Sequence, residues 1–116
     1  MTITRIGVGP RMSQAVLHGA TVYVAGQVAN KTAGQSVEAQ TREIVETIDA
    51  LLAEAGSDKT KILSATIYLV DMTTFPEMNK VWDSWVVPGH TPSRATVEAK
   101  LAAPSYKVEI AVIAAK

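Results

Sequence analysis

The run KVEIAVIAA near the C-terminus constrains the fold of this chain more than any other stretch. Its alternating, β-branched residues predict a last strand over about residues 106 to 115. One face of this strand carries Val108, Ile110 and Val112, and the other carries Ala111 and Ile113. A strand that is apolar on both faces is typical of a sheet that is covered on both sides. Two covering layers are therefore needed, from this chain or from another molecule.

The preceding elements follow from hydrophobic periodicity and turn residues. Residues 2 to 7 alternate weakly, and SQAVLHGATVYVAGQV holds two short β-type runs joined through Gly19. This pattern predicts an N-terminal β-meander. A helical stripe begins at Ser36, and Gly56 is suited to end it. The run KILSATIYLV, residues 61 to 70, predicts a further strand.

A second helix is expected to begin at Thr74 and to end before Gly89. Thr74 and Glu77 match a capping box, and Pro76 is tolerated in the first turn. A strand over about residues 93 to 101 then precedes the last one. The predicted order of elements is βββ-α-β-α-ββ.

This order predicts one α+β domain over residues 1 to 116, with a single mixed β-sheet and two helices on one face. Nothing else in the chain can cover the second apolar face, and such a patch is unusual for a monomer. We therefore infer that other copies of the chain cover it in a closed homo-oligomer. Eleven Lys and Arg balance eleven Asp and Glu, and a net charge of zero favours self-association.

Composition excludes several classes of function. The chain has no Cys, and His18 and His90 are far apart in sequence, so no metal site and no disulfide are expected. Without a basic stripe, binding to nucleic acid or to an anionic membrane is not expected. The sequence shows no signal peptide and no membrane-spanning segment, and we predict a cytoplasmic protein.

Two charged residues in predicted strands need a partner. Arg94 shares a polar row with Thr96, Glu98 and Lys100, on the face that we expect the helices to leave uncovered. It either points to water or, in an oligomer, binds an anion, because a buried unpaired guanidinium is costly. Glu109 is a lone carboxylate on an apolar strand. It either pairs with a nearby cation or faces Arg94 across a small cavity, where it holds or deprotonates a water.

Two further polar residues lie close to these in the predicted order. Asn79 borders the apolar stripe of the second helix, between Phe75 and Trp82, and suits a half-exposed position there. His90 lies in the loop before Arg94, where a surface position and a catalytic role are both open. The stripe with Trp82 and Trp85 is interpreted as core.

Four stretches in order resemble one family: MSQAV with GATVYVAGQV, then AGS with KIL.ATIYLVDM..F..MN, then PSRATVEA, and finally YKVEIAVIAA. Together they span almost the whole chain and are similar to the reactive intermediate deaminases, the RidA/YjgF family. The segment MNKVWDSWVVPGHTPSR is similar in particular to the YoaB-like branch.

The resemblance implies a chorismate-mutase-like fold and a homotrimer with a ligand cleft at each subunit interface. It implies hydrolysis of enamine and imine intermediates, such as 2-aminoacrylate, to 2-keto acids and ammonia. No metal and no organic cofactor is implied. The expected partners are small 2-imino or 2-keto carboxylates, with neither nucleic acid nor membrane.

The resemblance also assigns site residues by position. The carboxylate-binding arginine falls on Arg94 and the water-handling glutamate on Glu109, and Asn79 and Gly26 match residues that line the cleft. Met12 stands where many members have a cleft tyrosine, and it lacks the phenol's hydrogen bond. Thr96 stands where a cysteine is frequent, so a thiol-dependent activity is not expected.

Two other functions are compatible with the same residues. The first is a non-catalytic trimer that binds small carboxylates through Arg94, as a sensor or an enzyme partner. The second is a ribonuclease or translation inhibitor, an activity ascribed to some relatives. Zero net charge and the lack of a basic stripe argue against the second.

Overall fold

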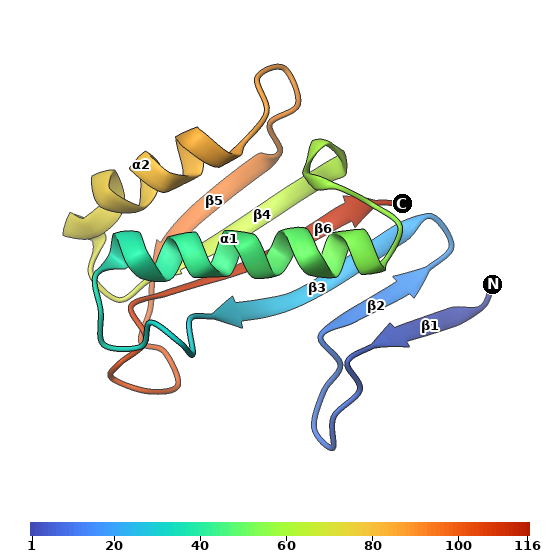
Figure 1. The fold of residues 1–116 in the computed structure, drawn as a ribbon, viewed down its shortest axis with the longest axis horizontal. Helices are drawn as coiled ribbons and strands as arrows, with labels where there is room; N and C mark the ends of the chain where they lie inside the picture. The colour runs from blue at the N-terminus through green and yellow to red at the C-terminus, as the bar shows by residue number, and fades with distance from the viewer.

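The computed structural model describes all 116 residues, and its backbone forms one six-stranded sheet with two α-helices on one face (Figure 1). The strands are β1 (Ile3–Ile6), β2 (Ala15–His18), β3 (Thr21–Val28), β4 (Ile62–Leu69), β5 (Ser93–Glu98) and β6 (Val108–Ala115). The helices are α1 (Val37–Glu54) and α2 (Phe75–Trp85), and two short 3-10 helices, Lys59–Lys61 and Met72–Thr74, precede β4 and α2. The predicted order of elements is confirmed, although β5 ends three residues earlier than expected.

Chain connectivity explains why both helices lie on the same side. The strand order is β1-β2-β3-β6-β4-β5, and only β4 and β5 pair in parallel. Since β3 and β4 both pair antiparallel with β6, the units β3-α1-β4 and β4-α2-β5 are both crossovers between strands of the same direction. Both advance the same way across the sheet, so the right-handed rule puts both helices on one face. The sheet is mixed, as predicted.

The core lies between this face and the helices. β6 contributes every second residue to it, and α1 contributes a stripe at helical spacing. The largest fully buried apolar side chains are Ile44, Ile48, Leu52, Ile67, Leu69, Met78 and Ile110. None of the helices is long and apolar enough to span a membrane.

The opposite face of the sheet has no covering layer within the chain. Tyr23 and Ile113 are cross-strand neighbours there, and they are 46% and 36% exposed. Val97, on the edge strand β5, is 42% exposed on the same face. The apolar second face predicted from the last strand is therefore present and is open to solvent in the single chain.

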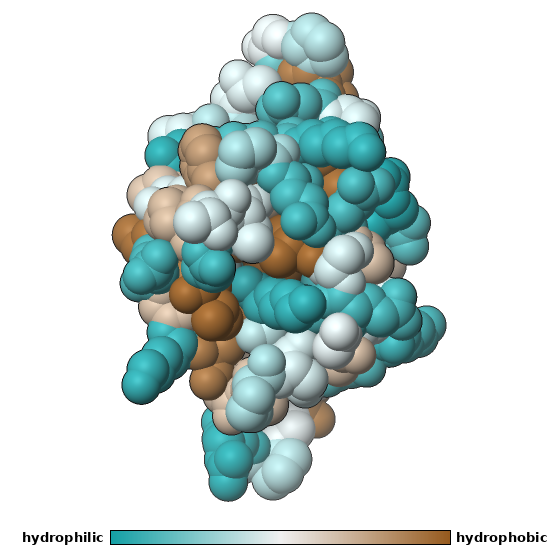
Figure 2. Space-filling view, turned by 90° about the vertical axis from the view of Figure 1, so that its left-hand side faces the viewer, coloured by the Kyte–Doolittle hydropathy of each residue, from teal (hydrophilic) through white to brown (hydrophobic).

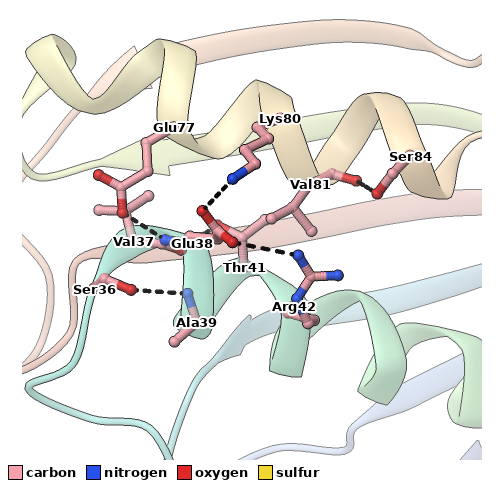
Figure 3. A network of polar contacts seen from close by, with 10 residues as sticks. All are labelled: Ser36, Val37, Glu38, Ala39, Thr41, Arg42, Glu77, Lys80, Val81 and Ser84. Carbon is pink, nitrogen blue, oxygen red and sulfur yellow. Dashed lines mark hydrogen bonds and ion pairs between the residues drawn. The ribbon is translucent and has the colours of Figure 1, made fainter.

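The predicted capping box is wrong. Thr74 makes no side-chain bond to the first turn of α2, and its hydroxyl donates to the Asp71 carbonyl. Glu77 reaches across to α1 instead, where its Oε2 accepts from the Glu38 backbone N–H at 2.7 Å (Figure 3). A tertiary contact at the start of another helix has replaced the local one.

Glu38 links the same two helices through its side chain. Its carboxylate accepts from Lys80 on α2 at 3.1 Å and pairs with Arg42 at 3.5 Å (Figure 3). The Lys80 ammonium is the largest cause that keeps the Glu38 pKa below its ordinary value. The beginnings of α1 and α2 are thus joined by Glu77 and by the Glu38 cluster.

Glu77→Ala should lower the free energy of unfolding by about 0.5–2 kcal/mol, because it leaves an N–H in the first turn of α1 without a partner. Urea unfolding of Glu77→Ala and of Glu46→Ala, an exposed carboxylate on α1, provides the comparison. The control should change stability by less than about 0.5 kcal/mol. Equal losses in the two variants would contradict this role of Glu77.

Candidate functional site

Arg94 lies on the helix-covered face of the sheet, so the predicted placement of its row on the uncovered face is wrong. Its neighbour across the β4–β5 pair is Ala65, which is buried under the helices. Side chains directly opposite each other in paired strands share a face. Because β5 is the edge strand, Arg94 is only half-buried there.

Three residues of α2 contact the Arg94 guanidinium. Its Nη1 donates to Asn79 Oδ1 at 2.7 Å. The Cζ atom lies 5.5 Å from the Phe75 ring centroid and 5.4 Å from that of Trp82, which are cation–π distances. Asn79 and Arg94 are thus brought together, as the sequence suggested.

No carboxylate of the chain pairs with Arg94. Both ion pairs of the molecule involve Glu38, and the bond to Asn79 uses one of five guanidinium N–H groups. A half-buried cation with four uncommitted donors is suited to an anion from outside the chain.

Thr96 adds a second unpaired polar group beside Arg94. It lies two residues further along the same face of β5, about 7 Å away. Its Oγ1 is shielded from solvent, and it is the one buried side-chain polar atom without a hydrogen-bond partner. Buried hydroxyls are normally paired, so Thr96 is an exception next to Arg94 on this face of the strand.

Gly26 and Glu109 form a second cluster, on the uncovered face. Glu109 pairs with Val28 on β3 and with Tyr68 on β4. Residues of β6 are buried alternately, and Glu109 lies on the face opposite the buried residues. A Cβ added to Gly26 would come within 2.2 Å of Glu109 Oε2, so the glycine makes room for the carboxylate. Glu109 makes no ion pair with any cation of its own chain, so the salt bridge considered as an alternative does not form within a single chain.

The two clusters lie on opposite faces of one sheet. Arg94, Asn79 and Thr96 point toward α2, whereas Glu109 and Gly26 are on the face without helices. The expectation that Arg94 and Glu109 face each other across a cavity is therefore wrong for a single chain. A guanidinium and a carboxylate so placed can act on one ligand only if two copies of the chain meet.

The surface hollows of the single chain lie away from both clusters. The largest have volumes of about 450 and 410 Å³, and the second is at the end of the molecule where α1 and α2 begin. Figure 2 looks onto this end, where hydrophobic atoms are exposed between polar ones. Ser36, Asp71, Glu77 and Lys107 are among its lining residues. None of the predicted site residues lines any of the hollows.

Met12 and His90 are not part of either cluster. Met12 lies in the loop between β1 and β2, and its side chain is 47% exposed. His90 is exposed in the loop before β5. The pKa of Asp58 is lowered mainly by hydrogen bonds from Thr60, and His90 adds a small electrostatic contribution. The side-chain hydrogen bond of Arg94 is made with Asn79, and His90 takes no part in it.

The stripe with Trp82 and Trp85 was interpreted from the sequence as core, and both side chains are buried. The contact of Phe75 and Trp82 with Arg94 was missed. The signal was present in the order Phe75, Asn79 and Trp82, since spacings of four and three residues align all three on one face of a helix. An amide between two aromatic rings is an unusual composition for a core stripe.

Comparison with known proteins covers the whole chain. Residues 2–116 match the family model described as Endoribonuclease L-PSP. A RutC family protein of Haemophilus influenzae is 49% identical over 114 residues, 98% of each chain. The RutC family protein YoaB of Escherichia coli K12 is 48% identical over 115 residues, 99% of each chain.

Solved structures agree with this match. A crystal structure of a member of the YjgF protein family from Neisseria meningitidis superposes with a TM-score of 0.97 at 45% identity. The alignment covers 100% of this chain and 96% of that chain.

Gly26→Ala should displace the Glu109 carboxylate, because the three atoms nearest to the added methyl group all belong to that side chain. The Glu109 carboxyl ¹³C resonance is expected to shift, while the free energy of unfolding falls by about 1 kcal/mol or less, since a flexible side chain can move. In a Glu109→Ala background the same substitution should have no such cost. An equal cost in both backgrounds would show that Gly26 serves the backbone instead.

Proposed function

The chain belongs to the RidA/YjgF family, in its YoaB-like branch, and on this premise we propose that it hydrolyses small 2-imino acids to 2-keto acids and ammonia. Enamines such as 2-aminoacrylate are substrates after they tautomerise to the imine. The reaction adds water across the C=N bond and releases the nitrogen as ammonia.

The observation that supports this proposal most is the unpaired Arg94 guanidinium beside the unpaired Thr96 hydroxyl. A 2-imino acid carries a carboxylate, which matches two parallel N–H groups of an arginine. Hydrogen bonds to charged groups contribute about 1.5–3 kcal/mol each, enough to select a carboxylate over a neutral imine. Thr96 and the amide of Asn79 supply further polar contacts at the same place.

Glu109 is the base in this mechanism. It lies against Gly26 with no cation to neutralise it, so its carboxylate is free to accept a proton from water. The water oxygen attacks the imine carbon, and its proton passes to Glu109. Glu109 passes this proton to the imine nitrogen, which gives the neutral carbinolamine. When its C–N bond breaks, the hydroxyl proton passes through Glu109 to the departing nitrogen, and the keto acid and ammonia are released. No metal or organic cofactor takes part.

Arg94 of one copy and Glu109 of a neighbour form the complete site, which requires an oligomer. Their positions on opposite faces of the sheet support this arrangement, and so does the open apolar face around Tyr23 and Ile113. Contact between two different surface patches is heterologous, and it gives a ring when the rotation between copies closes. We propose a homotrimer with one ligand cleft at each interface. Met12, on an exposed loop, is proposed as a lining residue of that cleft.

Carboxylate binding without catalysis is the second candidate, because the features of the Arg94 cluster would serve it equally. The name Endoribonuclease L-PSP belongs to the family model. A balance of eleven basic and eleven acidic residues gives little support for RNA as a ligand of this chain. Glu109 discriminates between hydrolysis and simple binding.

Arg94→Ala should lower kcat/KM for imine hydrolysis about 100-fold or more, because two charged hydrogen bonds to the carboxylate are lost. Glu109→Gln should lower kcat by a factor of about 10² or more and leave the affinity for 2-oxobutanoate within about threefold. A serine or threonine dehydratase generates the imine, semicarbazide competes for it, and keto-acid release is recorded.

Lys100→Ala is the matched control, because this cation is exposed and lies six residues after Arg94. It should behave as the wild type does. Wild-type protein that binds 2-oxobutanoate but leaves imine hydrolysis unaccelerated would refute the enzyme and support the binder. Full activity in Arg94→Ala would refute the proposed site itself.

A further inference from the structure

The Arg94 guanidinium is held by a row of α2 residues with an aromatic ring at each end. Phe75 and Trp82 are seven residues apart, which is about 10.5 Å along a helix axis. The Cζ atom of Arg94 lies 5.5 Å from one ring centroid and 5.4 Å from the other. These distances place the guanidinium between the two rings, and we call Phe75 and Trp82 the aromatic clamp.

Asn79 fixes the remaining freedom of the guanidinium. It lies between the clamp residues on the same face of α2, and its Oδ1 accepts from Arg94 Nη1 at 2.7 Å. Nη1 is on the opposite edge of the guanidinium from the Nε–H group. The Nε–Nη2 edge therefore stays free, and it carries two parallel N–H donors with no partner in the chain.

We infer that Phe75 and Trp82 are positioning residues, which hold Arg94 so that its Nε–Nη2 edge can grip a ligand. The inference rests on the proposed function, because it assumes that the ligand is a carboxylate. An edge with two parallel donors matches a flat carboxylate held in two hydrogen bonds. Rings on either side favour approach in the plane of the guanidinium over approach from above or below it.

The clamp also explains why the guanidinium is ready to bind before the ligand arrives. A free arginine side chain occupies many rotamers, and ordering it at the moment of binding weakens affinity. The two cation–π contacts and the Asn79 bond order it in advance. The clamp thus acts on affinity for the carboxylate and has little effect on the later attack of water.

Trp85 offers a matched control on the same helix. It is 7% exposed and its ring centroid is 5.3 Å from that of Trp82. Its Nε1 donates to Asp49 on α1 at 3.0 Å, and it makes no cation–π contact with Arg94. Trp85→Leu removes a buried tryptophan from α2 and leaves both clamp residues, Phe75 and Trp82, in the chain.

The test compares wild type, Phe75→Leu, Trp82→Leu, Trp82→Phe and Trp85→Leu. The first measurement is the ¹H–¹⁵N resonance of Arg94 Nε–H in the free protein, assigned by its loss in Arg94→Lys. Rings beside the guanidinium should shift the proton upfield in the wild type. Both clamp-to-Leu variants should lose this shift, whereas Trp82→Phe and Trp85→Leu should keep it.

The second measurement is the Kd of 2-oxobutanoate, followed by titration of the same resonance. Phe75→Leu and Trp82→Leu should each raise Kd about 5- to 30-fold, as loss of a desolvated cation–π contact predicts. The KM for the imine should rise in parallel while kcat changes less than about threefold, because the clamp acts on binding. Trp82→Phe should restore most of the affinity.

Several results would overturn the inference. One is an unchanged resonance and Kd in Trp82→Leu, and another is an equal loss of both in Trp85→Leu, which indicates a general defect of α2. A wild-type resonance that does not respond to 2-oxobutanoate also overturns it. If the wild type binds 2-oxobutanoate through the clamped Arg94 but does not accelerate imine hydrolysis, the deaminase proposal fails and the clamp stands.

Discussion

Two right-handed crossovers in the same direction determine the rest of this structure. They place α1 and α2 on one face of the sheet, so the other face has no helix to cover it. The covered face becomes the core, and the edge of that face becomes the place where α2 meets β5. The uncovered face keeps Tyr23 and Ile113 exposed, which a single chain cannot remedy. Both the site and the proposed assembly follow from this one-sided arrangement.

The proposed chemistry depends on charges that the chain itself does not pair. Arg94 is ordered by two aromatic rings and an amide, all neutral groups, so its charge remains uncompensated. Glu109 is accommodated by the missing side chain of Gly26 and meets no cation. An ion pair between these two residues within one chain would have neutralised both charges and left neither for a ligand. Opposite faces of the sheet keep them apart within one chain, and in the proposed assembly a neighbouring copy brings them together.

Sequence periodicity predicted the elements, the mixed sheet and the open apolar face, because alternation and helical spacing are local properties. It also placed Arg94 and Thr96 on the same face of their strand. On the last strand, it placed Glu109 on the opposite face from Val108 and Ile110. Alternation does not say which face the helices cover, and a polar row was assigned to the uncovered side. This assignment failed because Phe75 and Trp82 stabilise a cation under α2 at the sheet edge. The capping box failed similarly, since Glu77 satisfies a donor of α1 that is 39 residues away in sequence.

The central claim is that Arg94 of one copy and Glu109 of another act on the same substrate. Subunit complementation tests it most directly: Arg94→Ala and Glu109→Ala proteins are unfolded together, refolded as a mixture and assayed for imine hydrolysis. Each variant alone should be inactive, and the mixture should regain roughly a quarter of the wild-type sites by random assembly of a ring. A mixture as inactive as its components, with mixed oligomers demonstrated by mass spectrometry, would contradict a site shared between copies.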